Sequence, residues 1–282
     1  MDHRKLQTLL AVLRTGSFSR AAAELNCSQS AVTQMMNALE SELGCKLVSR
    51  SHNGAHLTPA GEALLPLIVE ADACLTHLSE QAQAIVQGSK VPIRIGSFSS
   101  LSNAWLPTSI RDYQKEHPAV TFDIRIGTDV IPRWLKSGEI DIALADAQRC
   151  KGFRWFPLMD DFYYAILPQG MVDENTQAIH QNELNRYPFI IASSDSVNNK
   201  LDPFPSKYIS VNCDDGTTLM SMVDQGLGVT VMSRLSLTNS PASIRILELQ
   251  PPVKRVLGIA LSDSPSKAAK DFAAFLRKRF PY

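Results

Sequence analysis

The sequence predicts an α/β protein made of three successive segments, and three patterns support this prediction. Apolar residues at helical spacing, followed by an Asn-Gly hairpin signal, mark residues 1–58. A heptad stripe marks residues 59–89, and strand patterns alternate with helix patterns over 90–282. A length of 282 residues and a hydrophobic content of 44% fit a globular chain with more than one domain.

The first segment begins with three predicted helices. Apolar residues within Leu6–Leu13 predict the first helix, which Gly16 interrupts. The Ala-rich stretch Arg20–Leu25 predicts the second. The third begins after Ser28, whose hydroxyl can accept a backbone N–H bond in the first helical turn. It ends at Gly44, because glycine adopts the left-handed conformation without strain.

A hairpin and a long helix follow. The stretches KLVSR and HLT flank Asn53-Gly54, a pair that favours a tight turn between two strands. Thr58 then predicts the N-cap of a helix reaching about Gln87, with Pro59 at its first position. Pro66 is expected to kink this helix.

The long helix carries an apolar stripe with alternating spacings of four and three residues. This is the heptad pattern of a coiled-coil seam, so we expect the helix to be a dimerising linker. A helix packed inside a single domain is the alternative. The predicted seam consists of Leu64, Ile68, Ala71, Leu75, Leu78, Ala82 and Ile85.

The third segment alternates strand and helix patterns. VTFDIRI (Val120–Ile126) and IDIALA (Ile140–Ala145) are predicted strands with helical patterns between and around them. FYYAILP, PFIIAS, YISVN, VTVMS and LGIALS continue the series. Such alternation predicts an α/β sheet with parallel strands.

Composition restricts the cellular setting. No run of 18 or more apolar residues occurs, so we expect no membrane span. The apolar N-terminus is broken by Arg14 and lacks a cleavage site, which favours an amphipathic helix and a cytoplasmic protein. A formal net charge of zero does not exclude nucleic-acid binding, because acidic residues elsewhere on the surface can balance a small basic face.

Several motifs carry a family resemblance. GSFSRAAAELNCSQSAVTQMMNALESELGCKLVSR, with LTPAGEALLP after the hairpin, resembles the N-terminal domain of LysR-type transcriptional regulators. HPAVTFDIRIG, LKSGEIDIAL and VDQGLGVTVMS resemble that family's effector-binding domain in order and spacing. The sequence departs from the family pattern at four positions. Ser30 and Ser233 stand where relatives often have Pro. Gln34 stands where they often have Arg, and Val48 where they usually have Phe. The change at Gln34 bears on base preference.

The resemblance implies a winged helix-turn-helix, a dimerising linker helix and a two-lobed regulatory domain similar to periplasmic solute-binding proteins. It implies a tetramer in many members, control by a small-molecule effector, and recruitment of RNA polymerase. The first expected lobe comprises residues of about 91–162 together with 262–282, and the second comprises about 163–261. The chain is expected to cross between the lobes near Asp161–Ala165 and again near Leu257–Leu261.

The third helix has an outward polar face without Lys or Arg. In a helix-turn-helix this helix enters the major groove, where Gln and Asn can pair with adenine and Thr can contact thymine. A face that is merely solvated is the alternative. Gln34 is the first candidate for base readout. The predicted contacts to a dyad-symmetric duplex site are Ser28, Gln29, Ser30, Thr33, Gln34, Asn37, Arg50 and His52.

Few cations accompany this face. Six basic residues against four acidic ones give residues 1–58 a charge of about +2, which implies modest, salt-sensitive phosphate binding. Arg50 and His52 in the hairpin are candidates for phosphate or minor-groove contact. An intradomain salt bridge is the alternative for Arg50.

Hydroxyls follow several strands of the third segment. Ligands in such sheets bind beyond the carboxyl ends of the strands, and hydroxyls with free helix N–H groups favour an anion such as a carboxylate. Serines that only cap helices are the alternative. The predicted effector contacts are Ser99, Ser100, Ser102, Thr128 and Ser193.

An enzyme and a transport solute-binding protein are the rival classes. The sequence has no GxSxG, P-loop, HExxH or Cys/His cluster, so we predict no enzyme, metal or cofactor site. Asp160 and Asp161 are adjacent, and adjacent side chains on a strand point to opposite faces, so we do not expect them to form an acid/base pair. The helical N-terminus argues against a transport protein. Free or buried thiols are expected, with a redox pair as the alternative, at Cys27, Cys45, Cys74, Cys150 and Cys213.

Overall fold

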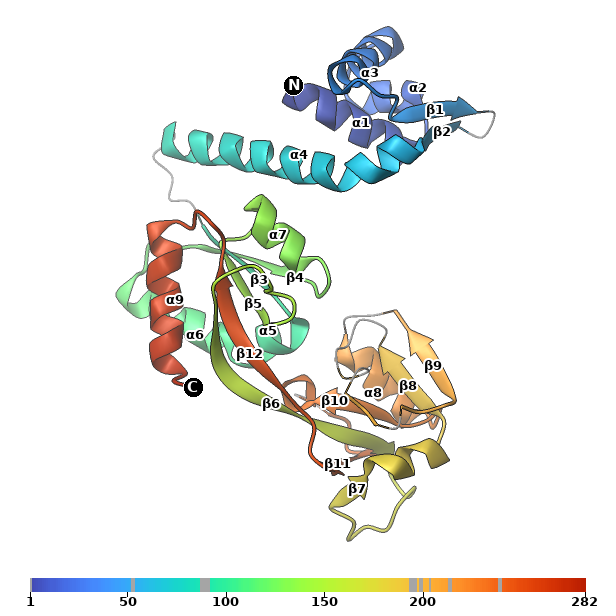
Figure 1. Cartoon of the computed structure of the whole chain (residues 1–282). Coiled ribbons are helices and arrows are strands. Elements are labelled where there is room, and N and C mark those ends of the chain that lie inside the picture. Colours follow the sequence, from blue (N-terminus) through green and yellow to red (C-terminus); the bar gives the residue numbers. More distant parts are fainter. Residues whose placement is uncertain are drawn as a thin grey trace. The chain divides into compact units, whose positions relative to one another are not determined.

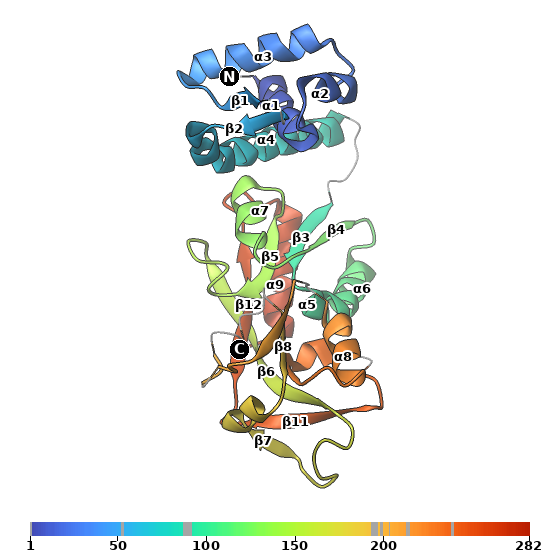
Figure 2. The same ribbon diagram turned by 90° about the vertical axis from the view of Figure 1, so that its right-hand side faces the viewer.

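The computed structural model describes residues 2–51, 54–86, 92–192, 197, 200–202, 204–212, 215–237 and 240–282. The chain separates into two compact units, Met1–Ser89 and Lys90–Tyr282. Figures 1 and 2 show a mainly helical first unit with a small hairpin and a second unit of sheets and helices. Each unit has a hydrophobic core of its own.

Three helices and a hairpin form the first unit. They are α1 (His3–Thr15), α2 (Phe18–Glu24), α3 (Gln29–Leu43) and the antiparallel pair β1 (Val48–Ser51) and β2 (Gly54–Leu57). These elements agree with the helices and hairpin predicted from the sequence. The Ala55 N–H donates to the Gly16 carbonyl at 3.0 Å, which ties the hairpin to the end of α1.

The long helix α4 (Pro59–Val86) follows the hairpin. Thr58 caps it as expected, because its Oγ1 accepts the Gly61 N–H at 3.0 Å. Pro66 lies inside the helix, and the ribbon of α4 bends in its N-terminal half (Figure 1). A proline cannot donate to the carbonyl four residues earlier, which accounts for a bend there.

The apolar stripe predicted on α4 has two different environments. Ile68 is buried in the core of the first unit, and Leu64, Ala71 and Leu75 pack against that core. Leu78 is 64% exposed, and Ala82 is exposed as well. The Ile85 side chain lies outside the described part of the structure. Part of the predicted seam therefore packs against the core of the chain's own first unit.

Another apolar row on α4 remains uncovered. Leu67 is 57% exposed and Cys74 is exposed, and with Leu78 they follow spacings of seven and four residues. Side chains at these spacings share one helix face. We call Leu67, Cys74 and Leu78 the free stripe of α4. The free stripe is thus exposed in the described part of α4, whereas Ile68 is buried and Leu64 and Leu75 are half-buried.

The first lobe of the second unit is built on one sheet. Its strand order is β4-β3-β5-β12-β6, with β4, β3 and β5 parallel and β12 antiparallel to both neighbours. The strands are β3 (Ile93–Ser97), β4 (Phe122–Ile126), β5 (Ile142–Asp146), β6 (Trp155–Pro168) and β12 (Lys254–Leu261). The helices are α5 (Ser99–Ala104), α6 (Leu106–Glu116), α7 (Ile131–Ser137) and α9 (Lys267–Arg279).

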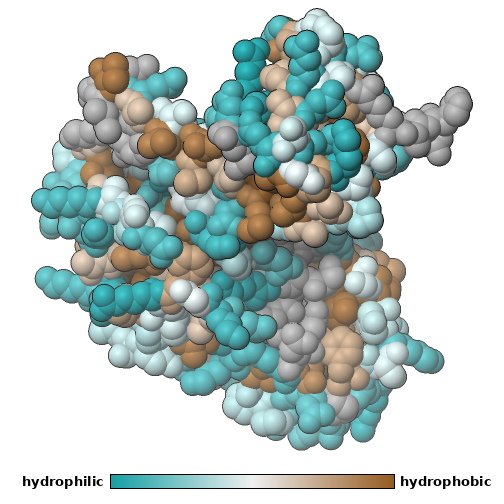
Figure 3. All heavy atoms as spheres, turned by 45° about the horizontal axis from the view of Figure 1, so that its top comes forward, coloured by the Kyte–Doolittle hydropathy of each residue, from teal (hydrophilic) through white to brown (hydrophobic). Residues whose placement is uncertain are grey.

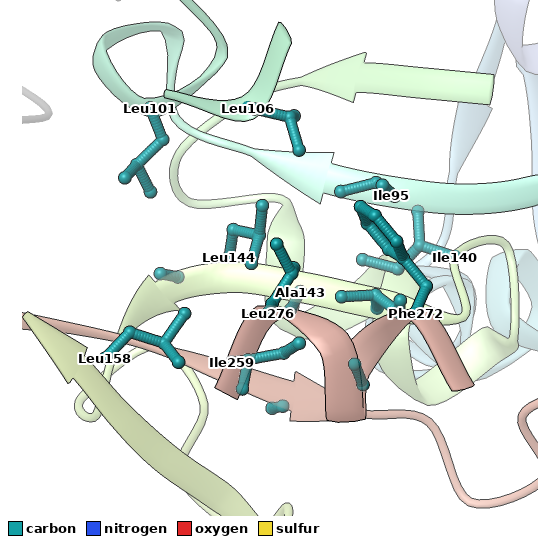
Figure 4. Packing of buried hydrophobic residues seen from close by; sticks show 14 of the residues in the cluster. Ile95, Leu101, Leu106, Ile140, Ala143, Leu144, Leu158, Ile259, Phe272 and Leu276 are labelled. Atoms are coloured by element: carbon teal, nitrogen blue, oxygen red, sulfur yellow. The ribbon is translucent and has the colours of Figure 1, made fainter. Parts of the chain in front are cut away.

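The core of this lobe lies between the sheet and the pair α6 and α9. Ile95, Leu144 and Ile259 from three strands meet Phe272 and Leu276 from α9 (Figure 4). The Tyr113 ring of α6 lies edge-on to Phe272, with ring centroids 4.9 Å apart. These side chains hold the strands and the helix α9 in place.

The second lobe continues the strand β6. The far half of β6 pairs with β10 (Thr230–Ser233) and β11 (Ile244–Gln250), and β7 (Ala178–His180) adds to β11. A separate parallel pair joins β8 (Phe189–Ala192) to β9 (Tyr208–Val211). The helices are α8 (Gly216–Asp224) and the 3-10 turns η1 (Gln181–Arg186) and η3 (Arg234–Leu237).

The crossing between lobes differs from the sequence prediction in one respect. The chain leaves the first lobe along β6, as expected, but it returns before Lys254 rather than near Leu257–Leu261. All of β12 belongs to the first sheet, since it pairs with β5 and β6 (Figure 1). The expected parallel sheet is also mixed, because the returning strand runs antiparallel. An alternating apolar strand pattern does not reveal its direction.

Hydrophilic residues dominate the face shown in Figure 3, and hydrophobic residues form separate smaller groups. Among the helices of the described part of the chain, none has the length and apolarity needed to span a bilayer.

Candidate nucleic-acid interface and ligand cleft

A cap at each end fixes the length of helix α3, and one buried face holds it on the core. Ser28 Oγ accepts the Ala31 N–H at 3.2 Å, and Gly44 closes the helix in the left-handed conformation at φ +70°. Val32, Met36 and Leu39 are at most 2% exposed and hold the helix on the core of the first unit. The cap, the stop and the apolar spacing predicted this arrangement correctly.

The opposite face of α3 is polar and open. Ser28, Gln29 and Ser30 in its first turn are exposed, as are Gln34 and Asn37, whereas Thr33 is half-buried. These six residues are brought together on one surface by the helix.

Two hydrogen bonds order the first turn of α3. Ser19 Oγ of α2 donates to Gln29 Oε1 at 3.0 Å, and the Ser28 and Ser30 hydroxyls lie 2.8 Å apart. The Gln29 amide nitrogen therefore keeps both of its donors for another group. This fits a surface that reads hydrogen-bond patterns rather than one that attracts charge.

Glu40 links α3 to the hairpin. Its side chain is 7% exposed, and its Oε1 accepts the backbone N–H groups of Leu47 at 2.9 Å and Val48 at 3.2 Å. Lys46 Nζ donates to the other oxygen at 2.7 Å. Burial alone would raise the pKa of Glu40, but these three hydrogen bonds outweigh it and lower the pKa below its ordinary value.

Glu40→Ala should loosen the start of β1. Two buried or half-buried N–H groups lose their acceptor, which costs about 1–3 kcal/mol and speeds amide exchange at Leu47 and Val48. In the wild type, the lowered pKa means that this stabilisation is present at neutral pH and is lost as pH falls through the folded-state pKa. Hydrogen exchange of the full chain measures it. Glu42→Ala, an exposed neighbour, is the control, and equal exchange in both variants would contradict this role.

Cations are scarce around this surface. Lys5, Arg14 and Lys46 each pair with a carboxylate, those of Glu42, Glu24 and Glu40 respectively. Among the described residues of the first unit, Arg4 and Arg20 form no such pair. Arg20 is exposed in α2, next to Ser19, and was not among the predicted contacts. The Arg50 side chain and His52 lie outside what the structure describes.

A cleft of about 550 Å³ lies in the second unit. Three predicted residues of α5 line it, and residues of α8 and η3 face them from the other lobe. Thr128 is not among the lining residues, and Ser193 is outside the described residues. The lining consists of Ser99, Ser100, Ser102, Asn103, Pro107, Asp215, Gly216, Thr217, Leu235 and Ser236.

Sequence reasoning missed the lining from the second lobe. The stretch GTTLMSMVDQG forms α8, and Asp215 is its N-cap. Asp215 Oδ1 accepts the Thr217 N–H at 3.0 Å. The capping position was the available signal, since a residue at a helix start lies where ligands meet a sheet edge.

A buried ion pair joins β6 to the start of β12, next to the crossing between the lobes. Arg255 Nε donates to Asp161 Oδ2 at 2.9 Å, and the Asp161 side chain is 0% exposed. The residues one position earlier on each strand, Lys254 and Asp160, lie on the exposed side and pair with each other at 2.7 Å. As predicted, the two adjacent aspartates face opposite sides and do not form an acid/base pair.

The described cysteines are free thiols. Cys74 is exposed, Cys27 and Cys45 are half-buried, and Cys150 is buried. Burial raises the pKa of the Cys150 thiol to about 12, so this thiol is protonated and unreactive at neutral pH. Cys213 lies outside the described residues.

Family models match both units. One described as "Bacterial regulatory helix-turn-helix protein, lysR family" matches residues 3–62. Another, described as "LysR substrate binding domain", matches residues 87–281. Together they cover nearly the whole chain.

Curated relatives and solved structures agree with these matches. A probable HTH-type transcriptional regulator LrrA of Synechococcus elongatus is 30% identical over 97% of this chain and 95% of its own length. MetR of Salmonella typhimurium is 26% identical over 82% of this chain and 74% of its own. The crystal structure of CbnR, a LysR family transcriptional regulator, has a TM-score of 0.75 at 18% identity, covering 100% of both chains. CbnR complexed with its target DNA gives 0.73 at 17% identity, covering 99% of each.

Proposed function

The chain belongs to the LysR family of bacterial transcriptional regulators, and from this premise we propose which residues read its DNA and where it is controlled. It is a regulator with a helix-turn-helix DNA-binding domain and an effector-binding domain. The proposed domains are residues 1–58 for DNA binding, 59–89 as the dimerising linker, and 90–282 for regulation.

The observation that carries the DNA proposal is the exposed, uncharged polar face of α3. Side chains with directional donors and acceptors read base edges, whereas cations hold phosphates. Gln34 is the first base reader, with Gln29, Ser30, Thr33 and Asn37 beside it. Arg20 on α2 is the added phosphate contact, because the first helix of this motif crosses the DNA backbone.

Gln34→Ala should lower sequence discrimination more than affinity in general. Its amide can pair with one adenine, so its loss should cost about 1–3 kcal/mol of discrimination at one base pair of each half-site. Fluorescence anisotropy on the cognate site and on singly substituted sites measures this. Ser41→Ala, exposed two turns further along the same helix, is the control. An equal loss on every sequence would remove Gln34 from base readout.

The hairpin is proposed to hold the DNA backbone through Arg50 and His52. The protein is proposed to act as a dimer, assembled into a tetramer, on dyad-symmetric promoter DNA. It would act in the cytoplasm with RNA polymerase as a partner and without enzymatic activity of its own. Symmetric pairing places two recognition helices on successive major-groove faces, which a dyad-symmetric site matches.

The cleft of the second unit is the proposed effector site. Ser99 and Ser100 come from the first lobe, and Ser236 comes from the second, so a bound molecule would contact both. A ligand that binds the closed arrangement more tightly shifts the lobes toward it. Thr128 and Ser193 remain proposed contacts. The effector-dependent change in lobe arrangement is proposed to alter how the dimer holds its DNA.

A further inference from the structure

The hydrogen bonds of Arg255 define which groups the cleft offers to a ligand. Besides its pair with Asp161, the guanidinium donates to Ser100 Oγ and to Ser233 Oγ, each at 3.1 Å. A guanidinium has no acceptor, so both serine oxygens must accept these bonds. Ser100 belongs to the first lobe and Ser233 to the second.

Each of the two serines still has an O–H to donate. Ser100 is 6% exposed and lines the cleft, so its O–H is available to a group that occupies the cleft. Ser233 is 2% exposed, and its Oγ lies 3.2 Å from Ser236 Oγ. Donating to Ser236 satisfies the buried Ser233 proton, and Ser236 then offers its own O–H to the cleft.

One part of the cleft therefore presents hydrogen-bond donors from both lobes. Ser102 Oγ adds a third hydroxyl, which is buried and has no hydrogen-bond partner among the described residues. Because Asp161 neutralises Arg255, these donors suit a group that accepts several hydrogen bonds, such as a carboxylate.

At the start of α8 the cleft presents a hydrogen-bond acceptor, the side chain of Asp215, instead of donors. It is the one charged side chain in the described lining. The Thr217 backbone N–H, donating to its carboxylate, lowers the pKa of Asp215, so it is ionised at neutral pH. Each carboxylate oxygen can accept more than one hydrogen bond. An amino group is the complementary partner.

We propose that the effector is a zwitterion whose carboxylate accepts from Ser100 and Ser236 and whose ammonium donates to Asp215. This inference rests on the proposed function of the cleft as the effector site. A dicarboxylate would place a second negative charge beside Asp215. A simple amine would leave the buried hydroxyl donors without an acceptor, which is costly.

Isothermal titration of the full chain tests the proposal. The probes are the twenty standard amino acids and several ω-amino acids, and for each that binds, its deaminated acid and its decarboxylated amine. We expect at least one zwitterion to bind, with either truncated analogue at least tenfold weaker. Binding of the acid or the amine as tight as the zwitterion, or no binding by any zwitterion, would overturn the proposal.

Two variants separate the zwitterion from the cleft itself. Asp215→Asn keeps a helix-capping residue but removes the charge, so it should weaken the zwitterion at least tenfold and its deaminated acid little. Ser236→Ala should weaken both. Asp224→Asn, at the far end of α8, is the control. Sensitivity to Ser236→Ala alone would keep the cleft and refute the zwitterion, and sensitivity to neither would refute the cleft as the effector site.

Discussion

Leu78→Glu is expected to convert the protein to a monomer and to lower its affinity for a two-half-site duplex by about 10²–10⁴-fold. Leu78 is 64% exposed and belongs to the free stripe of α4 with Leu67 and Cys74. A dimer binds its second half-site intramolecularly, so its loss removes that advantage without changing α3. A buried Glu in the seam has no partner and costs more than it gains.

Sedimentation velocity and anisotropy titration measure the two effects together. Gln83→Glu adds the same charge to an exposed position on another face of α4 and should leave both properties unchanged. Leu75→Glu is unsuitable as a probe, because Leu75 packs against the first unit's own core. A Leu78→Glu protein that stays dimeric, or a monomer that binds as tightly as the wild type, would rule out the free stripe as the seam.

Arg255→Met is expected to destabilise the second unit by about 3–5 kcal/mol, because it leaves the Asp161 carboxylate buried without its cation. Asp161 is fully buried, and its position on β6 lies opposite Arg255 on β12. Removing both charges with Asp161→Leu in the same chain should restore most of the stability, since apolar packing can replace a buried pair.

Urea unfolding followed by tryptophan fluorescence isolates this effect. All three tryptophans, Trp105, Trp134 and Trp155, lie in the second unit. Lys254→Met breaks the neighbouring exposed pair with Asp160 and should change the midpoint little, because water screens that pair. Equal effects of Arg255→Met and Lys254→Met would show that burial of Asp161 does not determine the cost.

The first unit was predictable because its signals are local. Ser28, Gly44 and Thr58 act on backbone groups within a few residues, and the structure has each in the predicted role. The dimer seam on α4 was harder to predict, because spacing shows which residues share a helix face but not what packs against that face. Leu64 and Ile68 have the spacing of a coiled-coil seam, yet Ile68 is buried in the first unit's core and Leu64 packs against it.

The cleft was predictable only from one lobe. Ser99, Ser100 and Ser102 follow a strand directly, so their place at the sheet edge could be inferred. Asp215 and Ser236 come from segments more than a hundred residues later, and no local pattern indicates that they face α5. The bond between Arg255 and Ser100 spans 155 positions and depends on the return of β12 to the first sheet.

Selection of binding sites from random duplex DNA by the full chain, with Gln34→Ala in parallel, tests the central claim most directly. The wild type should enrich two inverted half-sites, and Gln34→Ala should relax the same single position in both. Enrichment of sequences without dyad symmetry, or a Gln34→Ala protein that selects the same sequences more weakly at every position, would contradict the account of α3 as a base-reading helix in a symmetric dimer.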